Sequence, residues 1–195
     1  MGKKKKLFTK SIFIGVILGF ILFFIAGLLF PPSISERRVN EALAFCKENN
    51  LNTDYAVFVD FGKHSGRERY MIYSFSQHKV VYRCLCTGLS IDEYSNRQNC
   101  NLSYLGKYRI QKWSHKILVG KGERILADGL ERTYSNAKNK VILIYDSRLL
   151  DVFPKSLFPI PIIGKGISHG CFSITSEGIR KTQELPKPAL LWAYQ

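Results

Sequence analysis

The spacing of apolar side chains divides the chain into two parts. Residues 11–30 are an unbroken apolar run without a single charge. A helix of about 20 such residues is long enough to cross a bilayer. Residues 1–10 hold five lysines and no acid, and such a positive flank stays on the cytoplasmic side. We therefore expect a single-pass anchor at residues 11–30 in the cytoplasmic (inner) membrane, a cytoplasmic basic tail at residues 1–10, and a periplasmic or otherwise extracytoplasmic domain.

A cleaved signal peptide is the alternative interpretation of this run. The run is long for the apolar region of a signal peptide, and Phe30-Pro31-Pro32 offers no small-residue cleavage site. These features favour an anchor that is retained.

A lead-in helix is predicted within residues 31–50. Ser33 and Glu36 have the spacing of a capping box. Apolar positions then recur on one helical face until Asn49-Asn50, namely Val39, Ala42, Leu43 and Cys46. This amphipathic helix is expected to pack on the domain that follows.

From residue 55 the pattern changes to short runs rich in Val, Ile, Tyr and Phe, separated by turn residues. The predicted strands are 55–60, 69–75, 79–86, 107–112, 115–119, 141–145, 172–175 and 190–194. A short helix at 177–184 would be capped by Thr175 or Ser176. Residues 87–103 and 147–167 read as long irregular stretches suited to a binding groove. The expectation is one mainly β domain with minor α, residues 51–195, built as a sandwich or barrel.

Net charge narrows the choice of partners. The chain carries 29 basic and 15 acidic side chains, a net charge of +14. Five of the positive charges are in the tail, which leaves 24 − 15 = +9 beyond residue 30. A basic domain favours anionic lipid or an acidic wall polymer, and its place outside the cytoplasm argues against nucleic acid. Solubility alone is the alternative reason for the surplus.

The five cysteines do not indicate a metal site. Cys84-Leu85-Cys86 lacks metal-ligand spacing, and no histidine cluster accompanies it. An odd number of cysteines leaves at least one without an intramolecular partner. Buried thiols, or one bridge to Cys100, are the expected states.

One short segment carries candidate chemistry, Ser168-His169-Gly170-Cys171. A cysteine attacks a carbonyl when a nearby base or positive field populates its thiolate. In an extended segment His169 and Cys171 share a face, and Gly170 allows a substrate close to the backbone. The amides of Gly170 and Cys171 are then candidate donors to an oxyanion. Packing of a cysteine before a strand is the simpler alternative.

This segment resembles the catalytic signature of the murein L,D-transpeptidases, in the branch typical of Bacteroides-like bacteria. Further blocks similar to that branch follow in the family's order: 52–60, His64-Ser65-Gly66 to Arg69-Tyr70, 105–110, Gly129-Leu130-Glu131 with Ser135-Asn136-Ala137, and the strand 141–145. Several ordered blocks are more specific than one motif.

The resemblance implies a β-sandwich domain that acts on peptidoglycan stem peptides without metal or cofactor. In that mechanism the thiolate of Cys171 attacks the carbonyl of the third residue of a stem tetrapeptide. The terminal D-Ala leaves, and the acyl group passes to an amine of a neighbouring stem. The wall is thereby cross-linked.

The sequence departs from the family at three histidines. Their positions fall in Cys86-Thr87-Gly88, at Asp128 and at Tyr145. A neutral imidazole accepts a thiol proton near neutral pH more readily than a phenol or a lone carboxylate does. His169 is then the candidate base, oriented by Asp146 or Asp128, with Tyr145 in a supporting or packing role.

Three functions remain open at this stage. His115 or His64 could replace His169 as the base of an active transpeptidase. A carboxypeptidase would use water as the acceptor, and a pseudoenzyme would bind peptidoglycan without turnover.

Overall fold

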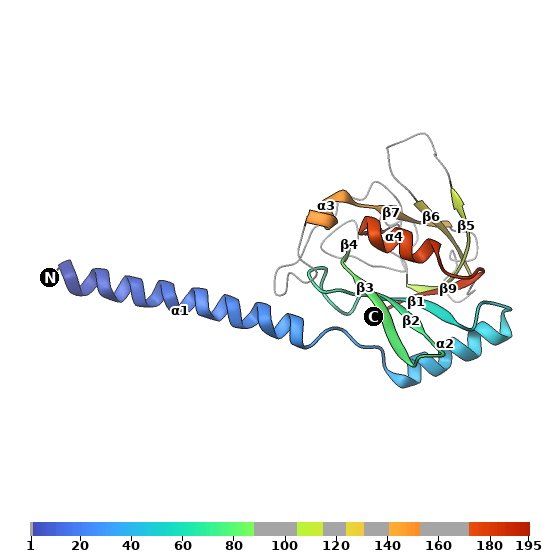
Figure 1. Cartoon of the computed structure of the whole chain (residues 1–195), viewed down its shortest axis with the longest axis horizontal. Helices are drawn as coiled ribbons and strands as arrows, with labels where there is room; N and C mark the ends of the chain where they lie inside the picture. The colour runs from blue at the N-terminus through green and yellow to red at the C-terminus, as the bar shows by residue number, and fades with distance from the viewer. Residues whose placement is uncertain (1, 88–104, 115–123, 131–140, 153–171) are drawn as a thin grey trace.

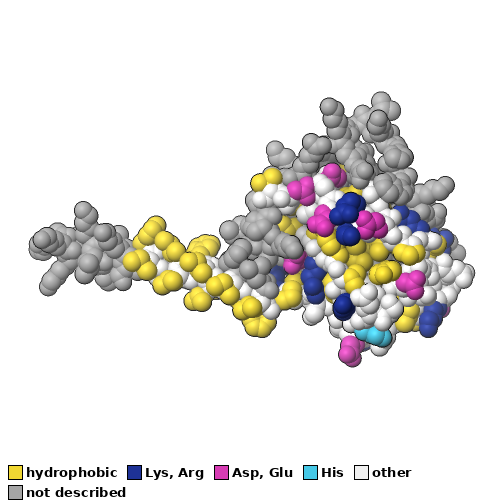
Figure 2. Space-filling view, in the orientation of Figure 1, with side chains coloured by type: hydrophobic (Ala, Val, Ile, Leu, Met, Phe, Trp, Pro, Cys, Tyr) yellow, Lys and Arg dark blue, Asp and Glu magenta, His cyan; other side chains and the backbone are white. Residues whose placement is uncertain are grey.

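The computed structural model describes residues 2–87, 105–114, 124–130, 141–152 and 172–195. The first element is a long helix, α1 (Gly2–Leu29), which projects away from the rest of the chain (Figure 1). Figure 2 shows apolar side chains along the surface of this helix. The exposed ones include Ile12, Phe20 and Leu29. Within the described part of the chain, no helix combines the length and the apolar character that a membrane span requires. The anchor at residues 11–30 stays a prediction.

Helix α2 (Glu36–Glu48) begins later than the sequence indicated. Its N-cap is Ser35, in extended conformation, so the capping box predicted at Ser33 is wrong. Ile34 packs against buried residues of the domain, which keeps the chain extended up to Ser35. The predicted apolar face is confirmed, since Val39, Ala42 and Cys46 are buried.

The described strands form one nine-stranded sheet with the order β3-β2-β1-β9-β5-β6-β7-β8-β4. Most neighbours are antiparallel, and two pairs, β1 with β9 and β7 with β8, are parallel. The strands are β1 Tyr55–Asp60, β2 Tyr70–Ser74, β3 Lys79–Cys84, β4 Cys86–Thr87, β5 Gly106–Ser114, β6 Arg124–Gly129, β7 Val141–Asp146, β8 Phe172–Ile174 and β9 Ala189–Tyr194.

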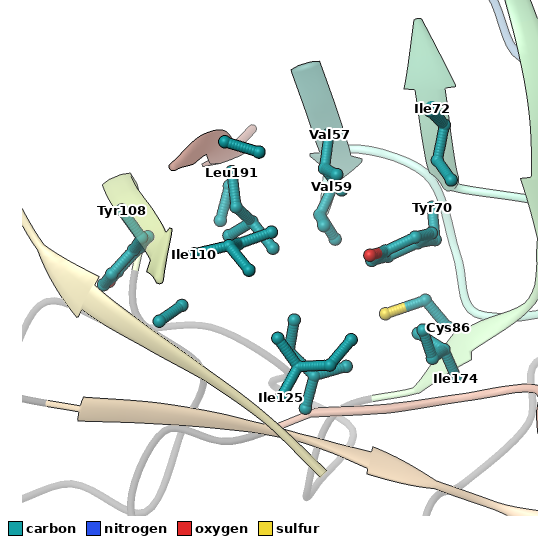
Figure 3. Packing of buried hydrophobic residues seen from close by; sticks show 14 of the residues in the cluster. Val57, Val59, Tyr70, Ile72, Cys86, Tyr108, Ile110, Ile125, Ile174 and Leu191 are labelled. Atoms are coloured by element: carbon teal, nitrogen blue, oxygen red, sulfur yellow. The ribbon is translucent and has the colours of Figure 1, made fainter. Parts of the chain in front are cut away.

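The sheet curls so that its two edges meet. Its edge strands, β3 and β4, are separated in the chain by Leu85 alone. All nine strands contribute side chains to one inner cluster, in which Val59 and Tyr70 lie across from Ile125 and Ile174 (Figure 3). A sheet that encloses its own core is the mainly β, sandwich-like arrangement expected from the sequence.

A second cluster lies on the outer face of β1, β2 and β9, under α2. Phe58, Met71 and Leu190 pack there against the apolar face of the helix. At the rim, Lys107 Nζ lies 3.0 Å from Glu41 Oε1 and 4.4 Å from the centre of the Trp192 ring. The helix is therefore a fixed part of the domain.

Helix α4 (Ser176–Gln183) packs against β3, β6 and β7. Its N-cap Thr175 accepts the Gly178 amide at 3.1 Å, as predicted for a helix in this position. Ile179 enters the inner cluster, and the Thr182 hydroxyl lies 2.6 Å from the Tyr70 hydroxyl. The helix therefore contacts both the inner cluster and Tyr70 of β2.

Two elements were not predicted from the sequence. Strand β6 was missed because its outward positions Leu126 and Asp128 do not give a clean polar alternation. Helix α3 (Arg148–Val152) lies inside the stretch 147–167 that was expected to be irregular. The predicted strand at 115–119 lies outside the described residues.

Candidate active site

The proposed catalytic segment lies outside the described residues. Ser168, His169, Gly170 and Cys171 all belong to the stretch 153–171, directly before β8, which begins at Phe172. The described neighbours of this segment are β8 and the strands on either side of it, β7 and β4.

Strand β8 lies between β7 and β4. Ser173, two residues after Cys171, is in register with Tyr145 of β7 and with Thr87 of β4. Directly opposed side chains on neighbouring strands have Cβ atoms about 5 Å apart. Three hydroxyl side chains thus form one row across three strands. Thr87 lies in Cys86-Thr87-Gly88, the segment in which the family resemblance places one histidine, and Tyr145 stands at the position of another.

This row is on the outer face of the sheet. Ile144, Ile174 and Cys86 belong to the inner cluster, and Figure 3 shows the last two pointing inward. Because side chains alternate along a strand, Tyr145, Ser173 and Thr87 point to the other face. Thr87 is buried there, and Tyr145 and Ser173 are half-buried.

Asp128 shares this outer face but not the row. Ile125 and Ala127 point into the inner cluster, so Asp128 points outward. It is in register with Val141, whereas Tyr145 is in register with Arg124. Four residues along a strand amount to about 13 Å. The structure therefore places Asp128 and Tyr145 on one face but at opposite ends of β6 and β7.

The Asp146 carboxylate is hydrogen-bonded to the first residue of α4, Ser176. Asp146 lies in register with Ile174, at the end of β8 far from Phe172. Its Oδ1 accepts a hydrogen bond of 2.6 Å from the Ser176 hydroxyl. The Ser176 amide donates to Asp151 Oδ1 at 2.9 Å, and Asp151 Oδ2 is a second acceptor within reach of the same hydroxyl. Asp146 thus helps to fasten α4 to β7 and α3, and no sequence signal pointed to Asp151.

The described histidines have local roles. His64 Nδ1 accepts the Gly66 amide at 3.2 Å, inside its own turn. Burial, together with Arg67 and Arg69, lowers the pKa of His64 and favours its neutral form. His78 is exposed at the tip of the β2–β3 hairpin, with φ 51°. His115 lies outside the described residues.

Three cysteines are buried free thiols, which confirms that interpretation for Cys46, Cys84 and Cys86. Desolvation raises the pKa of Cys46 to about 11. Desolvation also raises the pKa of Cys84 to about 12, although hydrogen bonds with Thr175 and Tyr82 oppose the shift. Cys46 and Cys84 are therefore protonated near neutral pH and are poor nucleophiles.

A groove lies between β3 and α4. Its volume is about 710 Å³, and its lining includes Pro31, Glu68, Arg83, Asp151, Thr175 and Glu177. Across the described ranges, no group of three or more His, Cys, Asp or Glu side chains is placed to hold a metal ion.

Comparison with known proteins gives the family. Residues 32–194 match the family described as L,D-transpeptidase catalytic domain. The chain belongs to this family. The family resemblance predicted from the sequence is thereby confirmed, and the match includes α2 together with the β domain.

Among solved structures, one to which this chain is similar is the L,D-transpeptidase (residues 123–326) from Xylanimonas cellulosilytica DSM 15894. That structure is similar with a TM-score of 0.41 and 13% sequence identity, over 72% of this chain and 60% of that chain. No curated protein matches the chain.

Proposed function

We propose that this chain is a membrane-anchored cysteine L,D-transpeptidase that cross-links peptidoglycan. The family match over residues 32–194, with Ser168-His169-Gly170-Cys171 directly before β8, is the observation that carries the proposal. The Cys171 thiolate attacks the carbonyl carbon of the third residue of a stem tetrapeptide. The C–N bond breaks, protonated D-Ala leaves, and a thioester remains. An amine of a neighbouring stem then attacks the thioester and restores the thiol.

The surroundings of β8 support this choice of nucleophile. Strand β8 is hydrogen-bonded between β7 and β4, so the chain leaving Cys171 enters a fixed framework. Cys46 and Cys84 are unsuitable because burial raises their pKa values far above neutral. The reaction draws on the peptide bond already present in the substrate, which suits a compartment without ATP.

We assign the base to His169 and the oxyanion donors to the amides of Gly170 and Cys171. Of the two carboxylates considered as its orienting partner, Asp146 is hydrogen-bonded to Ser176. Asp128 is half-buried on the outer face and pairs with Val141, at the end of β7 that lies on the N-terminal side of the parallel strand β8. It is the better candidate for His169, which precedes β8, whereas Tyr145 lies farther along beside Ser173. Tyr145 and Thr87 flank Ser173 and are proposed to line the same site.

We also propose that residues 11–30 anchor the chain in the cytoplasmic membrane. These twenty residues carry no charge, and the described large apolar side chains of α1 are exposed to solvent. An apolar surface of this extent requires an apolar environment. The lysine-rich tail then lies in the cytoplasm and the β domain in the periplasm or its equivalent.

A second candidate function is a peptidoglycan-binding pseudoenzyme. It is favoured by one observation: Cys86-Thr87-Gly88, Asp128 and Tyr145 stand where the family resemblance places histidines. An L,D-carboxypeptidase, with water as the acyl acceptor, is the third.

Acylation by a carbapenem separates the enzymes from the pseudoenzyme. The full chain in detergent is incubated with the drug and its intact mass is measured. We expect a stoichiometric adduct that is absent in Cys171→Ala and retained in Cys84→Ala, whose thiol is protonated and buried. His169→Ala should lose the adduct if His169 is the base.

Failure to form an adduct between pH 6 and 9 would reject both enzymes and leave the peptidoglycan-binding pseudoenzyme. Incubation with a stem tetrapeptide then separates the two enzymes. A transpeptidase yields a cross-linked product, whereas D-Ala release without one indicates the carboxypeptidase.

A further inference from the structure

The segment between α1 and α2 is held by the domain through two arginine side chains. The Arg67 guanidinium donates to the carbonyl oxygen of Phe30. Arg83 Nε donates to the carbonyl oxygen of Pro32 at 3.3 Å. Pro32 is buried, and Ile34 packs on the outer cluster. Residues 30–35, called the strap below, are therefore bound to the surface of the domain.

Both arginines come from ordered parts of the domain. Arg83 belongs to β3, in register with Met71 of β2. Arg67 lies in the turn before β2, where its amide donates to His64 O at 3.0 Å. Arg69 of the same turn is buried and donates to Lys63 O at 2.9 Å and to Cys86 O at 2.7 Å. The two guanidinium groups therefore hold the strap against a rigid framework.

The strap is continuous with the long helix. The amide of Phe30 donates to Ala26 O at 3.0 Å, so the helical hydrogen bonding of α1 extends to the residue that Arg67 binds. The next step rests on the proposed anchor. If residues 11–30 span the hydrocarbon layer, Phe30 marks its outer boundary. A side chain bonded to Phe30 then lies in the phosphate-containing headgroup layer, where a long arginine side chain places its charge among the headgroups.

We propose that the strap face, formed by Phe30, Arg67, Val81 and Arg83, docks on the phospholipid headgroups of the outer surface of the membrane and fixes the orientation of the domain. Phe30 is 71% exposed and Val81 is 40% exposed, so the face offers apolar side chains beside its two cations. Such a mixture matches the boundary between headgroups and acyl chains.

Docking of this face places the groove between β3 and α4 beside the membrane. The groove shares Pro31, Val81 and Arg83 with the strap and the strap face. Helix α2 leads away from the end of α1 (Figure 1). Its 13 residues span about 20 Å, so its last residues, such as Glu48, lie well away from the strap.

Fluorescence quenching in nanodiscs tests the proposal on the full chain. A fluorescent amino acid replaces either Val81, in the strap face, or Glu48, exposed at the far end of α2. The lipids carry a nitroxide quencher on their headgroups. We expect the probe at Val81 to be quenched several-fold more strongly than the probe at Glu48.

The double variant Arg67→Gln/Arg83→Gln should remove most of this difference, because the domain is no longer fixed to the end of α1. The matched control is Arg180→Gln/Lys181→Gln on α4, which removes the same charge from exposed pairs with Glu184. It should keep the wild-type difference. If the double variant does not fold, as judged by circular dichroism, Arg83→Gln alone replaces it.

Equal quenching of the two probes in the wild type would overturn the docking proposal. So would an unchanged difference in the arginine variant. Failure of the anchor is seen separately, because a chain without a membrane span would not float with lipid vesicles in a density gradient. In that case docking is rejected together with the anchor.

Discussion

The two halves of the sheet use their outer faces differently. In β1 and β2, nearly every side chain is buried, because one face packs in the inner cluster and the other packs under α2. In β6, β7 and β8, the inner positions are apolar, but outer positions hold Asp128, Tyr145 and Ser173. The first half, β1 and β2 with α2 packed on their outer face, is called the platform below. The second half leaves one face available for polar chemistry.

This difference explains how the chain combines a rigid fold with a polar site. Strands β7 and β8 are anchored from one side by Ile144 and Ile174 in the core. Their outer side chains can therefore differ from the family pattern, as Tyr145 does, without removing apolar contacts from the core. Function and stability are sensitive to different faces of the same strands.

The largest expected effect on stability is in the platform. Phe58 is fully buried, and its ring centre lies 6.2–6.4 Å from those of Tyr73, Trp192 and Tyr194. Phe58→Ala should lower the free energy of unfolding by about 3–5 kcal/mol, since it removes a buried ring and leaves a cavity. Urea denaturation measures this loss. A loss below about 1 kcal/mol would mean that the outer cluster contributes little, against the comparison.

An intermediate effect is expected at Gly178 of α4, which packs against Cys84 of β3 and Ile174 of β8. A Cβ at Gly178 would lie 2.8 Å from Cys84 Sγ and 3.1 Å from Ile174 Cδ1. Gly178→Ala should cost about 1–3 kcal/mol through overpacking, which exceeds the helix-propensity gain of about 1 kcal/mol. The melting temperature and urea midpoint report it. In a Cys84→Ala background the cost should shrink, and an unchanged cost would show that the sulfur is not the obstacle.

The smallest effect on stability is expected on the polar face. Asp128→Asn should change the free energy of unfolding by no more than about 0.5 kcal/mol, because the side chain is half-buried and similar in size. It should nevertheless slow carbapenem acylation at least about tenfold, since an amide does not stabilise an imidazolium as a carboxylate does. Stopped-flow fluorescence measures the rate. Unchanged acylation would remove Asp128 from the proposed site.

The strands that were predicted correctly from the sequence are those marked by the local periodicity of apolar residues. The runs 55–60, 141–145 and 190–194 coincide closely with β1, β7 and β9. The run 79–86 was predicted as one strand, but it divides at Leu85 into β3 and β4, at opposite edges of the sheet. Neither glycine nor proline marks this division. It depends on pairing with β2 on one side and with β8 on the other, which local periodicity does not contain.

As with the fold, only part of the candidate site could be predicted from the sequence. The nucleophile segment was found from residue types and family blocks, and its geometry stays a prediction. That Thr87 and Tyr145 lie beside Ser173 follows only from the strand register, because the three residues are far apart in the sequence and belong to three different strands. Likewise, Ser176 was considered only as a helix cap, whereas its hydroxyl also joins Asp146 to Asp151.

The single residue between β3 and β4 limits how this protein can change in length. Leu85 is the entire connection, and Cys86 faces the core while Thr87 faces outward. Inserting or deleting one residue here would exchange those two orientations, because strand side chains alternate. Evolutionary gains and losses of residues are therefore expected after Thr87, and the spacing from Cys84 to Cys86 should be held constant by the geometry of the closure.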